Sequence, residues 1–179
     1  MTPSRIACIG SRNTPSYILG WMKDTGAEIV RLGPTIVSGN ATGADQAWAA
    51  GANLVAPSRV ELYLPWAAFE HGAIHPDNVV RAFPDEPIAK REHYYKLAQD
   101  NHTRWYYCTE PAKKLLARNA MIVSNVDVVF GYLCETGGTR HAFRIAKALG
   151  IPTFDVARED VRHTVERLVK RRDTLEELR

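Results

Sequence analysis

Three segments of the chain combine glycines with small hydroxyl or amide side chains, and each directly follows a short apolar run. They are residues 10–13 (GSRN), 38–45 (SGNATGAD) and 135–139 (ETGGT). Glycine lets the backbone come close to an anion, and the N-terminus of a following helix supplies unpaired N–H groups and a positive dipole end. The pattern therefore predicts a phosphate-binding crevice. Its expected ligand-binding residues are Gly10, Ser11, Arg12, Ser38, Gly39, Asn40, Thr42, Gly43, Asp45, Arg118, Asn119, Glu135, Thr136, Gly137, Gly138 and Thr139.

Two carboxylates in these segments could do chemistry on a sugar. Glu135 precedes the glycine pair, where a carboxylate could accept ribose hydroxyls or act as a general base or nucleophile at an anomeric carbon. A polar rim residue that orients the loop is the simpler interpretation of Glu135. Asp45 stands near the start of the next helix, where it either complements the helix dipole or organises the loop and the ribose. Both residues are candidate catalytic groups.

Arg118 and Asn119 lie inside an expected helix over residues 112–124. An arginine in a helix is usually a solvated surface charge, but Ala117 and Ala120 flank this pair and favour an inward-facing side chain. The planar guanidinium suits a phosphate or a ribose edge.

Other ligand signatures are missing from the sequence. There is no GxxxxGK[ST] loop, and no GxGxxG fingerprint followed by an acid after the next strand, so ordinary NAD binding is disfavoured. His71 and His75 have metal-ligand spacing, but Pro76 follows at once. We therefore expect no metal and no cofactor. The three cysteines form no CxxC pair, which argues against a zinc ribbon or a disulfide framework.

The segments are positioned by alternating apolar strands and helical patterns. Mostly continuous apolar runs of this length are typical of strands buried on both faces of a parallel sheet. Strands that alternate with helices predict a doubly wound, Rossmann-like α/β fold with a mainly parallel sheet of about five or more strands. The strands are expected at 5–10, 35–39, 60–65, 126–132 and 151–156, and the helices at 16–31, 44–53, 112–124 and 139–149.

Two parts of the expected single domain, residues 1–179, fall outside this alternation. Residues 66–111 are rich in proline, histidine and aromatic residues and have no clear strand, so we expect short helices that form a cap over the sheet. Residues 158–179 have apolar positions at helical spacing and predict a C-terminal amphipathic helix, packed on the core or on another subunit.

The composition is that of a globular protein without a membrane segment. Of the 179 residues, 45% are hydrophobic and 24% charged, and no apolar stretch reaches the roughly 20 residues of a membrane span. The first residues lack a secretory signal, so we expect a cytoplasmic protein. The net charge of +3 permits a phosphate-bearing partner but does not require nucleic acid.

The ordered motifs IACIGSRNTP, IVSGNATGADQAWA, LYLPW, ARNAMIVSNVDVVFGY and ETGGTRHAFRIAKALGIPTF resemble the SLOG superfamily of Rossmann-like nucleotide-binding proteins. They look closest to its DNA-processing protein A (DprA)-like branch and to small, often phage-encoded, single-domain members. The resemblance implies that the loops bind nucleotides, nucleotide-derived signals or single-stranded DNA, and that Arg118 contacts the ligand.

More distantly, the sequence resembles the LOG nucleoside-monophosphate phosphoribohydrolases. Those enzymes have a GGxGTxxE signature whose glutamate serves catalysis, whereas Ala142 holds that position here. The departure disfavours LOG-type hydrolysis unless Glu135 or Asp45 replaces the missing acid.

Three functions are therefore open. The leading hypothesis is binding of a nucleotide or nucleotide-derived ligand, without chemistry, at the C-terminal ends of the strands. The alternatives are an N-glycosidic-bond hydrolase or transferase acting on a nucleotide, and a recombination mediator that binds single-stranded DNA with help from the aromatic and basic cap. A homo-oligomer, dimeric or higher, is expected in each case.

Overall fold

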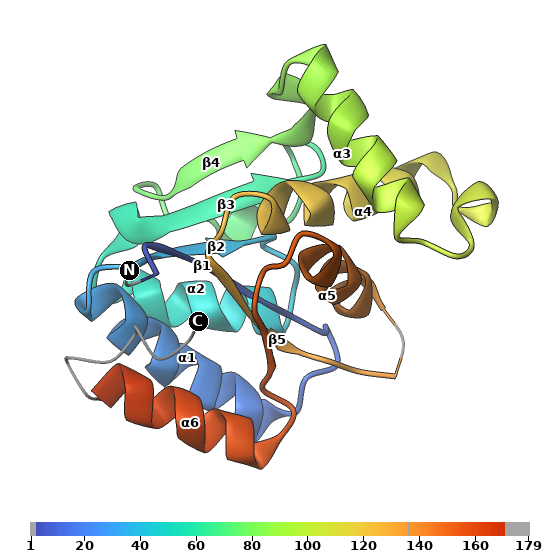
Figure 1. Ribbon diagram of the computed structural model, residues 1–179. Helices are drawn as coiled ribbons and strands as arrows, with labels where there is room; N and C mark the ends of the chain where they lie inside the picture. The colour runs from blue at the N-terminus through green and yellow to red at the C-terminus, as the bar shows by residue number, and fades with distance from the viewer. Residues whose placement is uncertain (1–2, 136, 171–179) are drawn as a thin grey trace.

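A computed structural model describes residues 3–135 and 137–170 and shows one parallel sheet between two layers of helices (Figure 1). The strands are β1 (Arg5–Gly10), β2 (Thr35–Ser38), β3 (Val60–Leu64), β4 (Val79–Ala82), β5 (Val128–Tyr132) and β6 (Thr153–Asp155). The helices are α1 (Ser16–Arg31), α2 (Ala44–Asn53), α3 (Ile88–Asp100), α4 (Glu110–Val123), α5 (Gly138–Ala148) and α6 (Glu159–Lys170).

The sheet has six strands in the order β4-β3-β2-β1-β5-β6, and every neighbouring pair is parallel. This arrangement confirms the predicted Rossmann-like fold. The direction in which successive strands are added reverses between β1 and β5, and ligands of such sheets bind outside the carboxyl ends of the strands at this reversal. The fold therefore brings the loops after β1 and β5 to the place where the sequence predicts a crevice.

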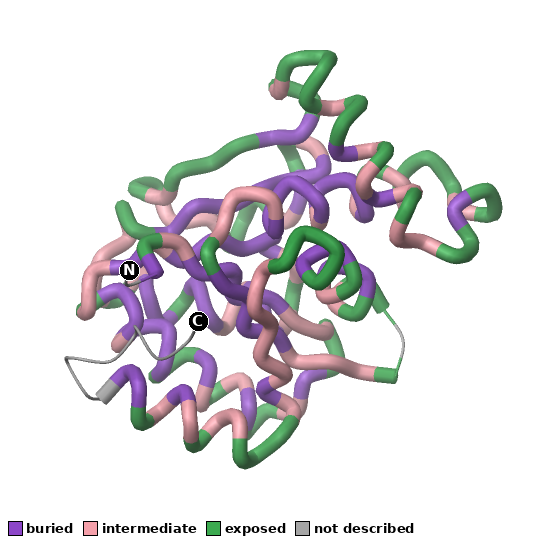
Figure 2. Tube along the Cα trace, in the orientation of Figure 1, coloured by how far each residue is buried: buried purple, intermediate pink, exposed green. Residues whose placement is uncertain are grey.

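Each face of the sheet has its own apolar core, because the central strands are buried on both sides. One core contains Ile6, Ile18, Met22 and Trp48 and joins the sheet to α1, α2 and α6. The other contains Ala117, Met121 and Ile145 and joins the sheet to α3, α4 and α5. Figure 2 shows the strands mostly buried and the outer surfaces of the helices exposed.

The C-terminal helix packs as the sequence predicts over its described part. Val165, Leu168 and Val169 of α6 are buried against the core that contains α1. Trp21 of α1 donates a hydrogen bond to Glu166 Oε1 at 2.7 Å. Residues 171–179 of the predicted helix lie outside the described residues.

The segment 66–111 differs in one respect from the expectation of short helices alone. It contains β4, which extends the sheet beside β3. Val79 and Val80 are 42% and 44% exposed on this edge strand, so the burial that makes a strand recognisable is missing. After β4 the chain forms α3 and a short turn of 3-10 helix, η4 (Trp105–Tyr107), which extend outward from the sheet above α4 and α5 (Figure 1). Within the segment 66–111 expected to form a cap, residues 88–109 are the part that lies above α4 and α5, and the name cap is kept for them.

Candidate functional site

A cavity of about 600 Å³ opens at the carboxyl ends of β1 and β5, between the loops and the cap. Of the predicted residues, those that line it are Gly10, Ser11, Arg12, Asp45, Arg118, Asn119, Gly137, Gly138 and Thr139. The remaining wall comes chiefly from α4 and the cap. The size and the position are those of a small-molecule or nucleotide site in an open α/β sheet.

The first loop reaches the cavity because Gly10 lets β1 lie against the start of α2. A Cβ at Gly10 would collide with the Cβ of Ala44. The Ser11 hydroxyl accepts a hydrogen bond from the Asn13 amide at 3.1 Å, and the Ser11 carbonyl accepts one from Thr14 at 2.8 Å. These bonds fix the loop and present Arg12, whose side chain is exposed, at the cavity.

The second loop supports the site more than it lines it. Ser38 is fully buried and donates to the Cys8 carbonyl at 2.6 Å, while Thr42 donates to Glu70 Oε2 at 3.0 Å. Asn40 has a positive φ of 58° and donates to the Glu70 carbonyl. Of residues 38–45, only Ala41 and Asp45 line the cavity. The hydroxyls of Ser38 and Thr42 and the side-chain NH2 of Asn40 are thus engaged within the protein.

Asp45 is 5% exposed and holds the first two loops together. Its carboxylate accepts hydrogen bonds from the backbone amides of Gly10, at 3.0 Å, and Ala41, at 3.3 Å. Burial raises the pKa of Asp45, and the positive charge of Arg118 opposes that shift. These contacts match the predicted loop-organising role more closely than a role on a ribose.

Arg118 is 4% exposed, so the structure places it inward as predicted. Its guanidinium donates to the carbonyls of Gly39 and, at 3.1 Å, Tyr63. Burial lowers the pKa of Arg118, and the charge of Asp45 opposes that shift. Its neighbour Asn119 donates to the Gly138 carbonyl at 3.2 Å and thereby ties α4 to the third loop.

The third loop contributes backbone rather than a carboxylate. Gly137 has a φ of +126°, a left-handed conformation that favours glycine, and with Gly138 and Thr139 it lines the cavity at the start of α5. Glu135 is exposed and is not among the described residues that line the cavity. Thr136 lies outside the described residues. A catalytic role for Glu135 remains a prediction.

The sequence does not predict the cap side of the cavity. Its wall combines apolar side chains of α4 with two histidines and a cysteine, namely Ala112, Leu115, Leu116, His102, Cys108 and His141. His141 lies two residues after the third loop, so its place beside that motif could have indicated it. No sequence pattern marks His102 or Cys108 as a site residue, because the sequence does not show how the cap folds back toward the cavity.

Residues 3–135 and 137–170, the part of the chain that the structure describes, contain neither a metal-binding cluster nor a membrane-spanning helix. No group of three His, Cys, Asp or Glu side chains in that part of the chain is placed to hold a metal ion. None of the helices described there is long and apolar enough to cross a bilayer.

The fold and the crevice together define a Rossmann-like α/β protein with a cavity at the carboxyl ends of its parallel strands. The family model described as DNA recombination-mediator protein A matches residues 1–57. No curated protein matches the chain. Among solved structures, DNA processing protein A from Helicobacter pylori, for which a single-stranded DNA binding mode is described, is similar with a TM-score of 0.63. The two sequences are 19% identical, and the match covers 98% of this chain and 78% of that one.

DNA processing protein A (DprA) from Streptococcus pneumoniae is also similar, with a TM-score of 0.56 and 18% identity over 91% of this chain. The chain spans 56% of the length of that protein. The family model and the two structures confirm the resemblance to the DNA-processing protein A branch, and the two structures show a shared fold.

Proposed function

We propose that the protein binds single-stranded DNA and holds one nucleotide of the strand in the cavity between the loops and the cap. The observation that carries the proposal is the pair Tyr106 and Tyr107, which are 84% and 89% exposed. They lie in η4, directly before Cys108, which lines the cavity. Two consecutive tyrosines exposed to this extent offer flat surfaces on which successive bases can stack.

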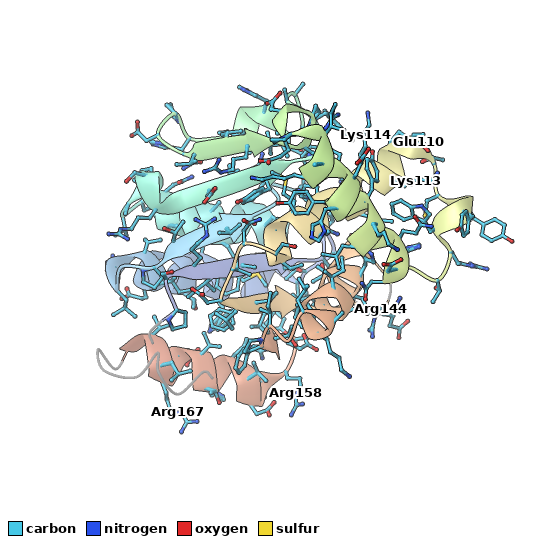
Figure 3. All side chains as sticks on the ribbon, turned by 45° about the horizontal axis from the view of Figure 1, so that its top comes forward. Glu110, Lys113, Lys114, Arg144, Arg158 and Arg167 are labelled. Carbon is cyan, nitrogen blue, oxygen red and sulfur yellow. The ribbon has the colours of Figure 1, made fainter. Side chains whose placement is uncertain are left out.

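Cationic side chains near the cavity supply the second element that a single-stranded DNA site needs. Arg12 lines the cavity, and Arg104 is exposed in the cap two residues before Tyr106. Figure 3 shows Lys114 of α4 and Arg144 of α5 on the cap side of the molecule, whereas Arg158, which directly precedes α6, and Arg167 of α6 lie at the other side. Arginines and lysines in these positions can track a phosphate backbone.

The likeness to DNA-processing protein A supports the same function. A single-stranded DNA binding mode is described for the Helicobacter pylori protein, which is similar over 98% of this chain. This interpretation reverses the order of the hypotheses drawn from the sequence, in which a free nucleotide came first.

A free nucleotide is the second candidate, and the cavity itself favours it. A volume of about 600 Å³ matches one nucleotide, and loop amides and helix N-termini can bind its phosphate without any further strand. A cytoplasmic location and a homo-oligomer remain part of the proposal for either ligand.

Competition between the two ligands separates the candidates. Fluorescence anisotropy would follow a labelled oligothymidylate of about 15 nucleotides, with thymidine monophosphate as the competitor. A DNA-binding protein should bind the oligonucleotide and release little of it to the mononucleotide. If the oligonucleotide does not bind while the mononucleotide raises the melting temperature, the free nucleotide is the ligand and the main proposal fails.

Variants locate the binding site. Arg12→Gln removes a cation at the cavity and should weaken oligonucleotide binding severalfold. Arg167→Gln removes an exposed arginine from α6, away from the cavity, and should leave the affinity unchanged (Figure 3). Equal affinities of the two variants would place the DNA elsewhere on the protein.

A further inference from the structure

The lining of the cavity combines two kinds of group. The loop residues Arg12, Gly137 and Gly138 contribute a cation and backbone amides that suit a phosphate. Leu115 and Leu116 of α4, together with the histidines of the cap and α5, contribute apolar surface and ring nitrogens that suit a base. A nucleotide has the same two parts, a charged phosphate and a flat base. The histidines are therefore the lining groups suited to the base.

The hydrogen bonding of His141 fixes which of its ring nitrogens carries a proton. His141 is 3% exposed, and its Nε2 lies 2.9 Å from the backbone carbonyl of Ala98. A carbonyl oxygen can only accept a hydrogen bond, so Nε2 must carry the hydrogen. Burial lowers the pKa of His141 to about 4, so the ring is neutral at neutral pH. Nδ1 is then a bare acceptor.

This acceptor has no partner within the described part of the chain. Nδ1 of His141 is buried and has no hydrogen-bond donor among those residues, although His141 lines the cavity. Buried polar atoms in proteins are almost always satisfied, so an unsatisfied acceptor beside a cavity indicates a group that is completed by a ligand.

The neighbouring side chains hold the ring of His141 in place. The His102 ring packs against it edge to face, with centroids 5.3 Å apart and an interplanar angle of 69°. His102 Nδ1 lies 3.9 Å from Cys108 Sγ and accepts a hydrogen bond from the Arg104 amide at 3.3 Å. The acceptor is thus held by the same cap segment that carries the two exposed tyrosines.

We propose that His141 is a base-recognition residue, whose Nδ1 accepts a hydrogen bond from an N–H group on the edge of the nucleobase in the cavity. The inference rests on the proposed function, because it requires a nucleotide of the strand to occupy the cavity. The ligand class that it specifies is a base with a free N–H, such as the N3–H of thymine. A base methylated at that nitrogen, or an abasic site, cannot make the bond.

Two substitutions separate this role from a structural one. In His141→Gln, the amide nitrogen can still donate to the Ala98 carbonyl in place of Nε2, while the Nδ1 acceptor is lost. In His141→Asn, the side-chain oxygen replaces Nδ1 as the acceptor, while the donor to Ala98 is lost. If His141 recognises the base, the Gln variant should bind DNA more weakly than the Asn variant. If His141 is only structural, the Asn variant should be the less stable protein, with no separate effect on DNA affinity.

The test measures anisotropy with three oligonucleotides of equal length, made of thymidine, of N3-methylthymidine and of abasic units. The wild type should bind the thymidine strand about three- to tenfold more tightly than the methylated strand, as one hydrogen bond allows. The Gln variant should lose a similar factor on the thymidine strand, show little further loss on methylation, and bind the abasic strand as the wild type does.

Thermal melting of both variants checks that they fold. A Gln variant that melts like the wild type and keeps the full preference for thymidine over N3-methylthymidine would overturn the inference while leaving the proposed function intact. An equal loss on all three strands would also overturn it, because the effect would not depend on the base. If the wild type binds none of the strands, the proposed function fails and the inference fails with it.

Discussion

Asp45 and Arg118 come together around Gly39, and this arrangement positions the loops of the cavity. The guanidinium of Arg118 donates to the Gly39 carbonyl, and the carboxylate of Asp45 accepts from the amides of Gly10 and Ala41. A Cβ at Gly39 would collide with the guanidinium and lie 2.8 Å from Asp45 Oδ2. Asp45 of α2 and Arg118 of α4 are buried and have opposite charges. Their hydrogen bonds thus hold the carboxyl ends of β1, β2 and β3 in place.

Replacing Gly39 by alanine should destabilise the protein, because the added methyl group enters the space between the two charged side chains. Overpacking of this kind costs about 1–3 kcal/mol of unfolding free energy. Gly20→Ala is the matched control, because a Cβ at Gly20 in α1 meets no atom within 4 Å. Alanine in a helix interior is favourable by up to about 1 kcal/mol over glycine, so the control should be neutral or more stable. Urea unfolding measures both, and equal stabilities would contradict the proposed crowding at Gly39.

Removing the charge of Arg118 should leave Asp45 as a buried, uncompensated carboxylate. Arg118→Met keeps much of the side-chain volume and should cost about 3–5 kcal/mol of unfolding free energy. The same substitution in an Asp45→Asn background should cost less, with a coupling energy of about 1 kcal/mol or more in a double-mutant cycle. Additive effects would show that the two side chains act independently.

The sequence predicts the central strands and helices closely. The ranges expected for α1 and α2 coincide with the observed helices. Pro15 directly precedes α1 and Gly43 directly precedes α2, so the sequence marks where each helix begins. β4 was missed because its exposed valines lie at the sheet edge and resemble a loop. A short edge strand is defined by pairing with its neighbour, and pairing leaves little trace in the local sequence.

The candidate site was only partly predictable for a related reason. Glycine-rich turns after strands identify where the backbone approaches a ligand, and Gly10 and Gly137 do line the cavity. The sequence does not show which side chains turn inward, so Ser38 and Thr42 were expected at the ligand although both are hydrogen-bonded within the protein. His102 could not be placed at all, because its position depends on the path of the cap.

The buried His141 should make stability fall as the pH decreases from about 6.5 towards 4. Burial lowers the pKa of His141 to about 4 in the folded protein. The charges of His102 and Arg144 also lower this pKa, whereas the hydrogen bond to Ala98 raises it. In the unfolded chain a histidine has a pKa of about 6.5, so within this window the unfolded state binds the extra proton. The stabilisation is fully present above the window and falls by up to about 3 kcal/mol across it.

His141→Gln provides the comparison for this pH dependence, since glutamine does not titrate. Urea unfolding at pH values from about 7 to 5 should show a smaller loss of stability in the variant than in the wild type. Identical losses in the two proteins would mean that His141 is not held neutral by the fold.

The exposed tyrosines of η4 should contribute to DNA binding through stacking. Replacing both Tyr106 and Tyr107 by alanine removes two stacking surfaces, each worth about 1–3 kcal/mol when a base occupies it. We expect at least a tenfold loss of oligothymidylate affinity with little change in melting temperature, because both side chains are exposed. Leu54→Ala removes another exposed apolar side chain, 73% exposed at the end of α2, and should bind like the wild type. Equal losses from both replacements would argue against stacking on η4.

The salt dependence of oligothymidylate binding tests the central claim most directly. Anisotropy titrations of the wild-type protein between about 50 and 200 mM salt would give the slope of the logarithm of the association constant against the logarithm of the salt concentration. If about three cations, such as Arg12, Arg104 and Arg144, contact the strand, the slope should be about −2. An absence of binding at low salt, or a slope near zero, would contradict the assignment of the crevice and cap as a single-stranded DNA site.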